Sequence, residues 1–247
     1  MDIQDSTVLV TGANRGIGKA FADALLDRGA AKVYAAVRDV ATVTDRRLVP
    51  IQLDVTDPER VAAVARELDD VQVVVNNAGA LSIATPLSAS LDVARAELET
   101  NYLGLVSVTQ AFAPVLQRNG GGAFINVVSA LSWVSMPLVA TYSASKAAAW
   151  SFTNAARIEL KLNGTQVVAV HPGPVDTEMT AAIDLPKITP ATVAVLALDA
   201  LEAGEPEAFV DDFGRMLKAG LSDDQATLYP QIERDFLAAV GAGTAAT

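Results

Sequence analysis

Hydrophobic residues gather in short, nearly continuous runs along the chain, and longer segments with helical spacing separate them. Runs of Val, Ile and Leu that do not alternate with polar residues are typical of strands buried on both faces of a parallel sheet. The pattern predicts strands at residues 7–11, 32–37, 49–53, 71–75, 123–128, 165–170 and, most weakly, 207–210. Helical spacing predicts helices at residues 16–28, 58–68, 91–117, 144–162 and 190–203.

This order of strands and helices indicates the architecture. Because crossovers between parallel strands are right-handed, the repeated β-α-β order predicts a doubly wound parallel sheet of about seven strands, flanked by helices, with ligands bound at the carboxyl ends of the strands. The chain contains no linker-like stretch, so we expect a single α/β domain over residues 1–247.

Two places depart from a regular pattern. Residues 39–48 leave room for only a very short helix between the second and third strands, which favours a trimmed surface connection. Thr100 and Asn101 interrupt a good helical pattern, so we expect a local kink there, although Asn101 could also be an ordinary exposed helix residue.

Composition excludes several classes of function. The formal net charge of −11 argues against nucleic acid or an anionic membrane as a partner. The chain has no cysteine and one histidine, which removes disulfides and Cys nucleophiles and leaves no expected metal site. The first residues carry acidic and no basic side chains, unlike a signal peptide, and we expect a cytoplasmic protein.

A glycine cluster follows the first predicted strand and opens the first helix. Gly12, Gly16 and Gly18 permit a tight turn and a close approach of the backbone to a pyrophosphate, and the helix N-terminus offers free N–H groups. Asn14, Arg15 and Ile17 lie between these glycines. Taken alone, the cluster is equally compatible with a plain turn between strand and helix.

The end of the second strand bears on which dinucleotide would bind. An acidic residue there would hold a ribose 2′-hydroxyl and repel a 2′-phosphate, but the strand ends in Val37 and Arg38. Arg38 and Arg15 can both reach a phosphate, which favours NADP(H). NAD(H) remains possible if both arginines are solvated and Asp39 turns inward.

Three residues have the chemistry of a reacting site. Tyr142 and Lys146 lie four apart, so on a helix they share one face, and the ammonium group can lower the pKa of the phenol. Ser129 follows a predicted strand and can donate a hydrogen bond to an oxygen on which charge develops.

Asn76-Asn77-Ala78-Gly79, Ser129 and the Tyr142 to Lys146 segment, together with the glycine cluster, resemble the short-chain dehydrogenase/reductase family over about residues 7–177. The resemblance implies a Rossmann-type sheet. It also implies that Tyr142 is the general acid/base, that Lys146 lowers its pKa and binds the nicotinamide ribose, and that Ser129 polarises the carbonyl. Asn101 matches an asparagine that holds a water for proton relay.

The resemblance also assigns further cofactor contacts. It places Asp54 and Val55 against adenine, and it places Asn77, Ala78 and Gly79 against the adenosine ribose. Residues 172–177 resemble the loop that covers the nicotinamide. Its implied contacts are Pro172, Gly173, Val175 and Thr177, the last two bonding the carboxamide. His171 precedes this loop and is expected to be structural.

Residues around the expected site are mostly apolar, which favours a hydrophobic carbonyl or alcohol as the small-molecule substrate. The candidates are Leu81, Leu131, Trp133, Met136, Pro174 and Met179. The helices at 91–117 and 144–162 carry small residues, including Ala148, Ala149 and Ala155, that could pair in a homo-oligomer, either a dimer or a tetramer. The ending departs from the family pattern and has helical spacing in Leu228, Ile232, Phe236 and Leu237.

These observations divide the expected domain into three parts. Residues 7–177 would form the cofactor and catalytic core, 178–205 a small substrate lid and helix, and 206–247 the last strand and a helical tail. The leading hypothesis is an NADP(H)-dependent carbonyl reductase that also works as an alcohol dehydrogenase. The alternatives are an NAD(H)-preferring enzyme of the same kind, a nucleotide-sensing regulator without turnover, or an isomerase or dehydratase that retains the cofactor.

Overall fold

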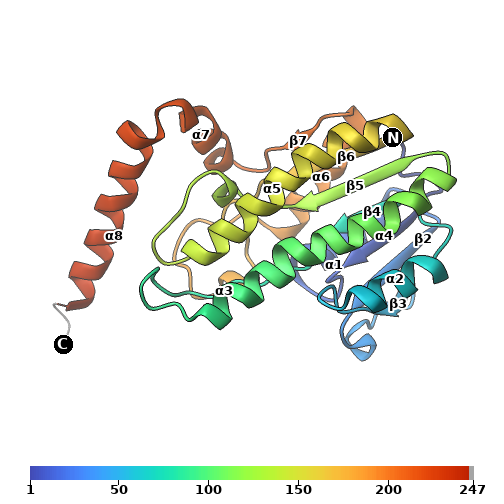
Figure 1. Ribbon diagram of the computed structural model, residues 1–247, viewed down its shortest axis with the longest axis horizontal. Coiled ribbons are helices and arrows are strands. Elements are labelled where there is room, and N and C mark those ends of the chain that lie inside the picture. Colours follow the sequence, from blue (N-terminus) through green and yellow to red (C-terminus); the bar gives the residue numbers. More distant parts are fainter. Residues whose placement is uncertain (245–247) are drawn as a thin grey trace.

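The structure is a computed structural model that describes residues 1–244. Residues 245–247 of the predicted tail, and the side chain of Phe236, lie outside the described part. Seven parallel strands form one sheet in the order β3-β2-β1-β4-β5-β6-β7, as expected for a Rossmann-type doubly wound fold (Figure 1). The strands are β1 (Thr7–Thr11), β2 (Lys32–Val37), β3 (Val49–Gln52), β4 (Val73–Asn76), β5 (Gly122–Val127), β6 (Thr165–Val170) and β7 (Glu207–Ala208).

Helices cover both faces of the sheet. They are α1 (Gly16–Asp27), α2 (Pro58–Glu67), α3 (Leu91–Leu98), α4 (Gly104–Arg118), α5 (Ala140–Leu160), α6 (Pro190–Ala203), α7 (Asp212–Gly220) and α8 (Tyr229–Thr244). Helices α1 and α6 pack together on one face, and α2, α4 and α5 lie on the other (Figure 1).

The core is divided by the sheet, because successive side chains of a strand point to opposite faces. In β1, Val8 and Val10 belong to the cluster under α1 and α6, whereas Leu9 belongs to the cluster under α2 and α4. Both clusters are fully buried around these residues. Most strands are therefore apolar on both faces, which is the reason that their sequence runs are continuous; the edge strand β3 is the exception, with Val49, Pro50 and Gln52 exposed.

Helix boundaries follow local signals in the sequence. The Asp57 side chain accepts from the Arg60 amide at the start of α2, and Thr189 caps α6 in the same way through the Thr192 amide. The predicted helix at 91–117 is broken into α3, a π-helical segment (Glu99–Leu103) and α4, which confirms the kink at Thr100 and Asn101. The short connection at 39–48 holds only a 3₁₀ turn, Val40–Thr42.

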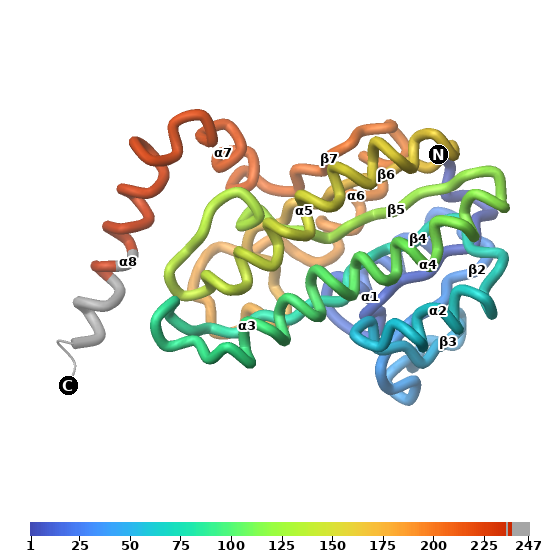
Figure 2. The backbone as a smooth tube through the Cα atoms, in the orientation of Figure 1, coloured from blue at the N-terminus to red at the C-terminus, as the bar shows by residue number. Residues whose placement is uncertain are grey.

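The end of the chain differs most from the expectation. The last strand is only two residues long, and the Asp211 side chain accepts from the Gly214 amide and caps α7, a helix that the hydrophobic pattern did not predict. Helix α7 contacts the 3₁₀ turn that follows β5, and the chain then continues into α8, which projects from the body (Figures 1 and 2). Among the described residues, no helix is both long and apolar enough to cross a lipid bilayer.

Candidate active site

The carboxyl ends of the strands open into a large cleft of about 1590 Å³, at the edge of the sheet where the crevice was expected. Its walls are the loops that follow β1 to β6, together with residues from α7 and α8. Almost all the candidate residues line this cleft, including Asn14, Ile17, Pro172, Gly173 and Val175. The three exceptions are Gly18, Asn101 and Trp133.

The glycine loop has the geometry that a bound pyrophosphate needs. Gly12 and Gly16 have φ angles of 66° and 53°, which other residues rarely adopt. A Cβ atom on Gly18 would lie 2.1 Å from the Gly12 carbonyl oxygen, so this glycine serves the packing of helix on loop rather than the cleft. The side chain of Arg15 does not cap α1, which leaves the amides of the first turn available to an anion.

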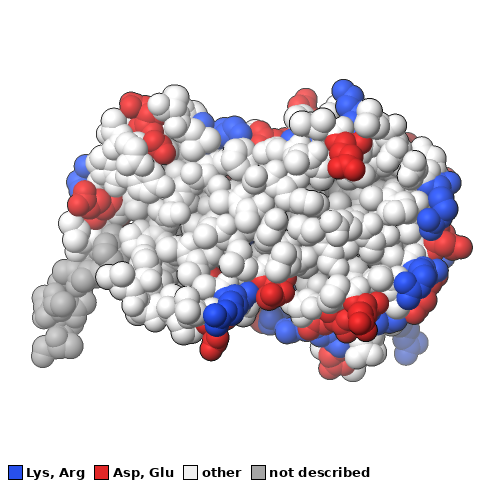
Figure 3. Space-filling view, viewed as in Figure 1, with Lys and Arg blue, Asp and Glu red and all other residues white. Residues whose placement is uncertain are grey.

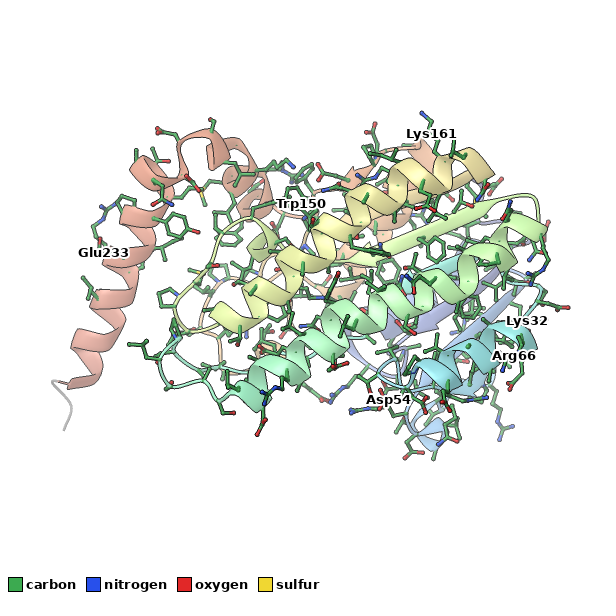
Figure 4. All side chains as sticks on the ribbon, viewed as in Figure 1. Lys32, Asp54, Arg66, Trp150, Lys161 and Glu233 are labelled. Atoms are coloured by element: carbon green, nitrogen blue, oxygen red, sulfur yellow. The ribbon has the colours of Figure 1, made fainter. Side chains whose placement is uncertain are left out.

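Hydrogen bonds join the turn after β4 to the end of β1, at the expected adenosine end of the cleft. The Thr11 hydroxyl accepts from the amides of Asn77 (2.9 Å) and Ala78 (3.1 Å), and Asn77 Nδ2 donates to the Thr11 carbonyl at 2.8 Å. Thr11 was not a candidate from the sequence, and its place at the end of β1 beside the turn was the available signal. After β3, Asp54 accepts from the amide of Thr56, and Asp54 lies at the lower edge of the sheet in Figure 4.

Two charged residues at the end of β2, Arg38 and Asp39, differ in their partners. Asp39 Oδ1 accepts from the Ala41 amide at 3.0 Å, so its carboxylate caps the 3₁₀ turn. Arg38 lines the cleft and takes part in none of the ion pairs formed by the described residues. Arg15 also lines the cleft, but it pairs with Glu178 of the opposite wall, which the sequence did not indicate.

Glycines also let the two walls approach each other. A Cβ atom on Gly16 would lie 3.2 Å from Thr177 Cγ2, so the glycine loop and the loop after β6 are in close contact. On the other side, a Cβ atom on Gly79 would lie 3.2 Å from Asn101 Oδ1 and 3.7 Å from Lys146 Nζ. The turn after β4 can therefore pass directly over these two polar groups.

Ser129, Tyr142 and Lys146 come together in the middle of the cleft. Ser129 precedes a 3₁₀ turn, and its hydroxyl accepts from the Leu131 amide at 3.1 Å. Tyr142 lies in the first turn of α5, and Lys146 Nζ, one turn later, is 5.8 Å from the centroid of the Tyr142 ring. Lys146 Nζ donates to the Val127 carbonyl at 2.9 Å, which fixes the ammonium group at the end of β5.

Electrostatics of the pair differ from the expectation. Burial raises the pKa of Tyr142 to about 12; the Ser129 hydroxyl opposes this shift and the Glu97 carboxylate adds to it. Burial lowers the pKa of Lys146 to about 8. The expected lowering of the tyrosine pKa by the lysine does not appear here, because burial dominates the pKa of Tyr142 and Lys146 is not among the groups that shift it.

Asn101 is 1% exposed, which excludes the reading of an ordinary surface residue. Its Oδ1 accepts from the Ala80 amide and its Nδ2 donates to the Ala80 carbonyl, both at 2.8 Å. Nδ2 also lies 2.9 Å from Ser145 Oγ. With Lys146, Asn101 lines a second cavity of about 10 Å³, close to the size that one water molecule needs.

The substrate end of the cleft has apolar walls. Leu81, Leu131, Met136, Pro174 and Met179 line it as expected. Trp133 is a correction: its ring stacks on His171 with centroids 4.1 Å apart, and it meets Trp150 edge-on at 6.3 Å.

Sequence reasoning missed part of this wall. Phe213 of α7 and Ile232 of α8 also line the cleft, as do Leu138, Ile183 and Leu185. Helical spacing in the sequence included Ile232 in a predicted helix of the tail. It did not indicate that this helix contributes a residue to the cleft.

Comparisons with known proteins identify the family. The family model described as short chain dehydrogenase matches residues 6–187. A short chain dehydrogenase from Burkholderia cenocepacia, solved in complex with NADP, is 40% identical with a TM-score of 0.90 and covers 94% of this chain and 99% of its own.

Among curated relatives, rat estradiol 17-beta-dehydrogenase 2 is 34% identical over 74% of this chain but 52% of its own length, so the chain spans about half of that relative. An NADP-dependent 3-hydroxy acid dehydrogenase from Schizosaccharomyces pombe is 30% identical over 72% of this chain and 74% of its own. The motifs, the sheet and these relatives together show that the chain belongs to the short-chain dehydrogenase family.

Proposed function

We propose that the protein is an NADP(H)-dependent oxidoreductase that interconverts a hydrophobic ketone or aldehyde and the corresponding alcohol. The observation that carries the proposal is that Ser129, Tyr142 and Lys146 line the same cleft as the glycine loop. A nicotinamide, when bound, supplies the hydride. The protein then has to orient the carbonyl and manage one proton.

The residues present fit such a cofactor. The positive φ angles of Gly12 and Gly16 and the uncapped start of α1 suit a pyrophosphate. Asp54 and Val55 would contact the adenine, the turn at Asn77, Ala78 and Gly79 the adenosine ribose, and residues 172–177 the nicotinamide. Tyr142 and Lys146 would hold the second ribose.

Two observations support a preference for NADP(H) over NAD(H). Both Arg38 and Asp39 line the cleft, but the Asp39 carboxylate is engaged with the Ala41 amide, whereas Arg38 has no ion-pair partner among the described residues. The 40% identical relative was solved with NADP. Arg15 would join the site only by leaving Glu178, so Arg38 is the principal phosphate ligand in this proposal.

Proton handling follows from the pKa values. With a pKa of about 12, the Tyr142 phenol keeps its proton at neutral pH and can donate it. In the reductive direction, hydride adds to the carbonyl carbon and the phenol proton passes to the carbonyl oxygen, while the Ser129 hydroxyl hydrogen-bonds that oxygen. Lys146, beside the small cavity shared with Asn101, is placed to return a proton to Tyr142 through a water.

The walls of the cleft support a hydrophobic substrate. Leu81, Leu131, Met136 and Met179 contribute flexible or branched apolar side chains, and Phe213 adds an aromatic one. Such a wall favours the burial of an apolar carbonyl compound over a highly charged one.

A homo-oligomer is also proposed, through the face that carries α4 and α5. Figure 3 shows this face largely free of charged side chains, which gather at its rim. On α5, the small side chains of Ala144, Ala148, Ser151 and Ala155 recur at helical spacing, and Ala144, Ser151 and Ala155 are exposed. Ala149 is fully buried and belongs to the core instead.

The proposal is tested by titrating the purified protein with NADPH and with NADH, and then following absorbance loss of NADPH with a panel of aromatic and aliphatic ketones and aldehydes. We expect tighter binding of NADPH and turnover of apolar members of the panel. Tight binding without any turnover would favour a nucleotide-sensing regulator. Equal binding of both cofactors would remove the argument from Arg38.

A further inference from the structure

His171, the one histidine of the chain, lies next to the segment that carries Ser129. His171 follows β6, is 0% exposed, and places Nδ1 3.3 Å from the main-chain carbonyl oxygen of Ser129. The side chain of Ser129 takes its orientation from the same segment, because its hydroxyl accepts from the Leu131 amide. Any shift of the Ser129 backbone would therefore move the hydroxyl that faces the cleft.

The other ring nitrogen faces a carboxylate from the last strand. His171 Nε2 lies 3.3 Å from Glu207 Oε1, a close contact that falls short of hydrogen-bond geometry, so Nε2 has no hydrogen-bond partner among the described residues. Lys218 Nζ of α7 lies 3.3 Å from both oxygens of Glu207, and Trp150 Nε1 lies 3.4 Å from Oε1. Glu207 thus connects β7, α5 and α7 to the histidine.

Aromatic rings fix the plane of the imidazole. Trp133 stacks on it at 4.1 Å, and Phe209 lies on it at 5.8 Å with an angle of 16° between the planes. Lys218 Nζ lies 4.8 Å from the centroid of Trp133 and 5.3 Å from that of Trp150. Trp150 lies on α5 toward β7 and α6 in Figure 4. The ring cannot rotate without displacing two packed aromatic side chains.

We propose that His171 is a positioning residue for Ser129, and that Glu207 and Lys218 hold it in place, so that the last strand and α7 set the position of the catalytic hydroxyl. The proposal rests on the proposed function, in which Ser129 polarises the carbonyl. Both groups that face the ring, the Ser129 carbonyl oxygen and the Glu207 carboxylate, are hydrogen-bond acceptors. Nδ1 lies within hydrogen-bond distance of the Ser129 carbonyl oxygen, and the contact of Nε2 with Glu207 holds the other end of the ring.

The charged groups around the ring agree with a carboxylate on Glu207. The contact with His171 lowers the pKa of Glu207 to about 2, and the nearby Lys218 acts in the same direction. Arg157 of α5 adds a further positive charge near Glu207, and its Nη2 donates to the Pro206 carbonyl at 2.9 Å. The bridge to Ser129 is therefore anchored on a charged group at neutral pH.

Glu207→Gln is the decisive variant, because it keeps the shape of the side chain and removes its charge. We expect kcat for ketone reduction to fall about tenfold, with the KM for NADPH and its binding constant changed less than twofold, since the phosphate end of the cleft is remote from the network. Glu205→Gln is the matched control, an exposed glutamate two residues away, and should leave kcat unchanged.

A spectroscopic readout separates this proposal from the proposed function. Because the chain has one histidine, ¹⁵N-labelled histidine gives a single pair of ring signals. We expect Glu207→Gln to move the Nε2 signal, because this nitrogen lies 3.3 Å from the carboxylate that the substitution removes, and Glu205→Gln to leave both signals in place. This outcome can be read even if no substrate is turned over.

Substitution of the histidine itself provides a rescue test. His171→Asn retains an amide that can donate toward the Ser129 carbonyl, so it should keep several-fold more kcat than His171→Leu at equal NADPH affinity. An unchanged kcat in Glu207→Gln, or equal losses of kcat in the two His171 variants, would overturn the positioning role. An Nε2 signal that Glu207→Gln leaves unmoved would overturn the contact between His171 and Glu207.

Discussion

At the end of β2, two neighbouring residues of opposite charge make different use of their side chains. Both line the cleft, but the Asp39 carboxylate caps a 3₁₀ turn, whereas Arg38 forms no ion pair among the described residues. In the sequence, the two residues could have exchanged these roles, because adjacency does not tell which side chain is engaged by the backbone. The hydrogen bond from the Ala41 amide to Asp39 distinguishes them.

Arg38→Asp should therefore shift cofactor preference toward NADH. We expect NADPH to bind about ten- to a hundredfold more weakly, because a hydrogen bond between charged groups contributes about 1.5–3 kcal/mol, while NADH affinity changes little. Fluorescence titration with both cofactors measures the effect. Arg66→Asp, an exposed change of the same charge on α2 (Figure 4), is the control. Unchanged NADPH affinity in Arg38→Asp would show that another group binds the phosphate.

Buried Lys146 should also make stability depend on pH. Its pKa is lowered from 10.5 to about 8 in the folded chain, so between these values the unfolded chain holds the proton and the folded chain does not. The free energy of unfolding of the cofactor-free protein should thus gain from this group as pH rises from 8 to 10, at up to about 1.4 kcal/mol per unit. The contribution is absent below pH 8.

Urea unfolding at several pH values between 8 and 10 measures this slope, and Lys146→Met should remove it. The same slope in both proteins would contradict the lowered lysine pKa.

The pairing of Tyr142 with Lys146 was predictable from their spacing on a helix. The directions of the two pKa shifts were not, because they depend on burial that only the folded chain defines.

At the scale of elements, the π-helical segment between α3 and α4 is built around one side chain. Asn101 bonds both backbone groups of Ala80 and also contacts Ser145, so it ties this helix to the turn after β4 and to α5. The interrupted pattern at Thr100 and Asn101 was enough to predict the kink. The partners of Asn101 come from segments 21 and 44 residues away, and spacing along the chain gives no information about them.

Asn101→Ala should lower the free energy of unfolding by about 1–3 kcal/mol, because two half-buried backbone groups of Ala80 lose their partners. Urea denaturation measures the change, and Gln110→Ala, at an exposed position on α4, should stay within about 0.5 kcal/mol. A loss in Asn101→Ala no larger than that of the control would contradict the structural part of its role.

Strands and helices of the core were predictable to within a few residues, since most strands are buried on both faces and α2 and α6 have their own capping residues. Helical spacing also predicted a helix in the tail, where α8 lies, but it did not predict α7. Helix α7 depends on the Asp211 cap, and the same Asp211 also accepts from the Gly173 amide at 2.6 Å, so its carboxylate connects α7 to the loop over the cleft. That contact joins two segments that are distant in the sequence. Phe213 and Ile232 likewise reach the cleft only through the tertiary fold.

The molecule as a whole is acidic, but two arginines lie at the expected phosphate site. The formal net charge is −11, yet Arg15 and Arg38 both line the cleft. Charge is also distributed unevenly over the surface, and the face carrying α4 and α5 is largely uncharged (Figure 3). This distribution leads to a prediction about assembly.

Ala155→Glu should weaken the proposed homo-oligomer, because like charges from two copies would meet where the face is now uncharged. Light scattering over a concentration series should show a smaller mass than for the unmodified protein. Ala203→Glu, at an exposed position of α6, is the control and should not change the mass. An assembled mass that is unaffected by Ala155→Glu would place the interface elsewhere.

The central claim is that this cleft transfers a hydride with Tyr142 as the proton donor. Its most direct test is to compare NADPH oxidation by the unmodified protein and by Tyr142→Phe, using a ketone that the panel shows to be turned over. We expect the variant to bind NADPH with unchanged affinity and to lose at least about a thousandfold in kcat. Turnover by Tyr142→Phe within tenfold of the unmodified protein would contradict it.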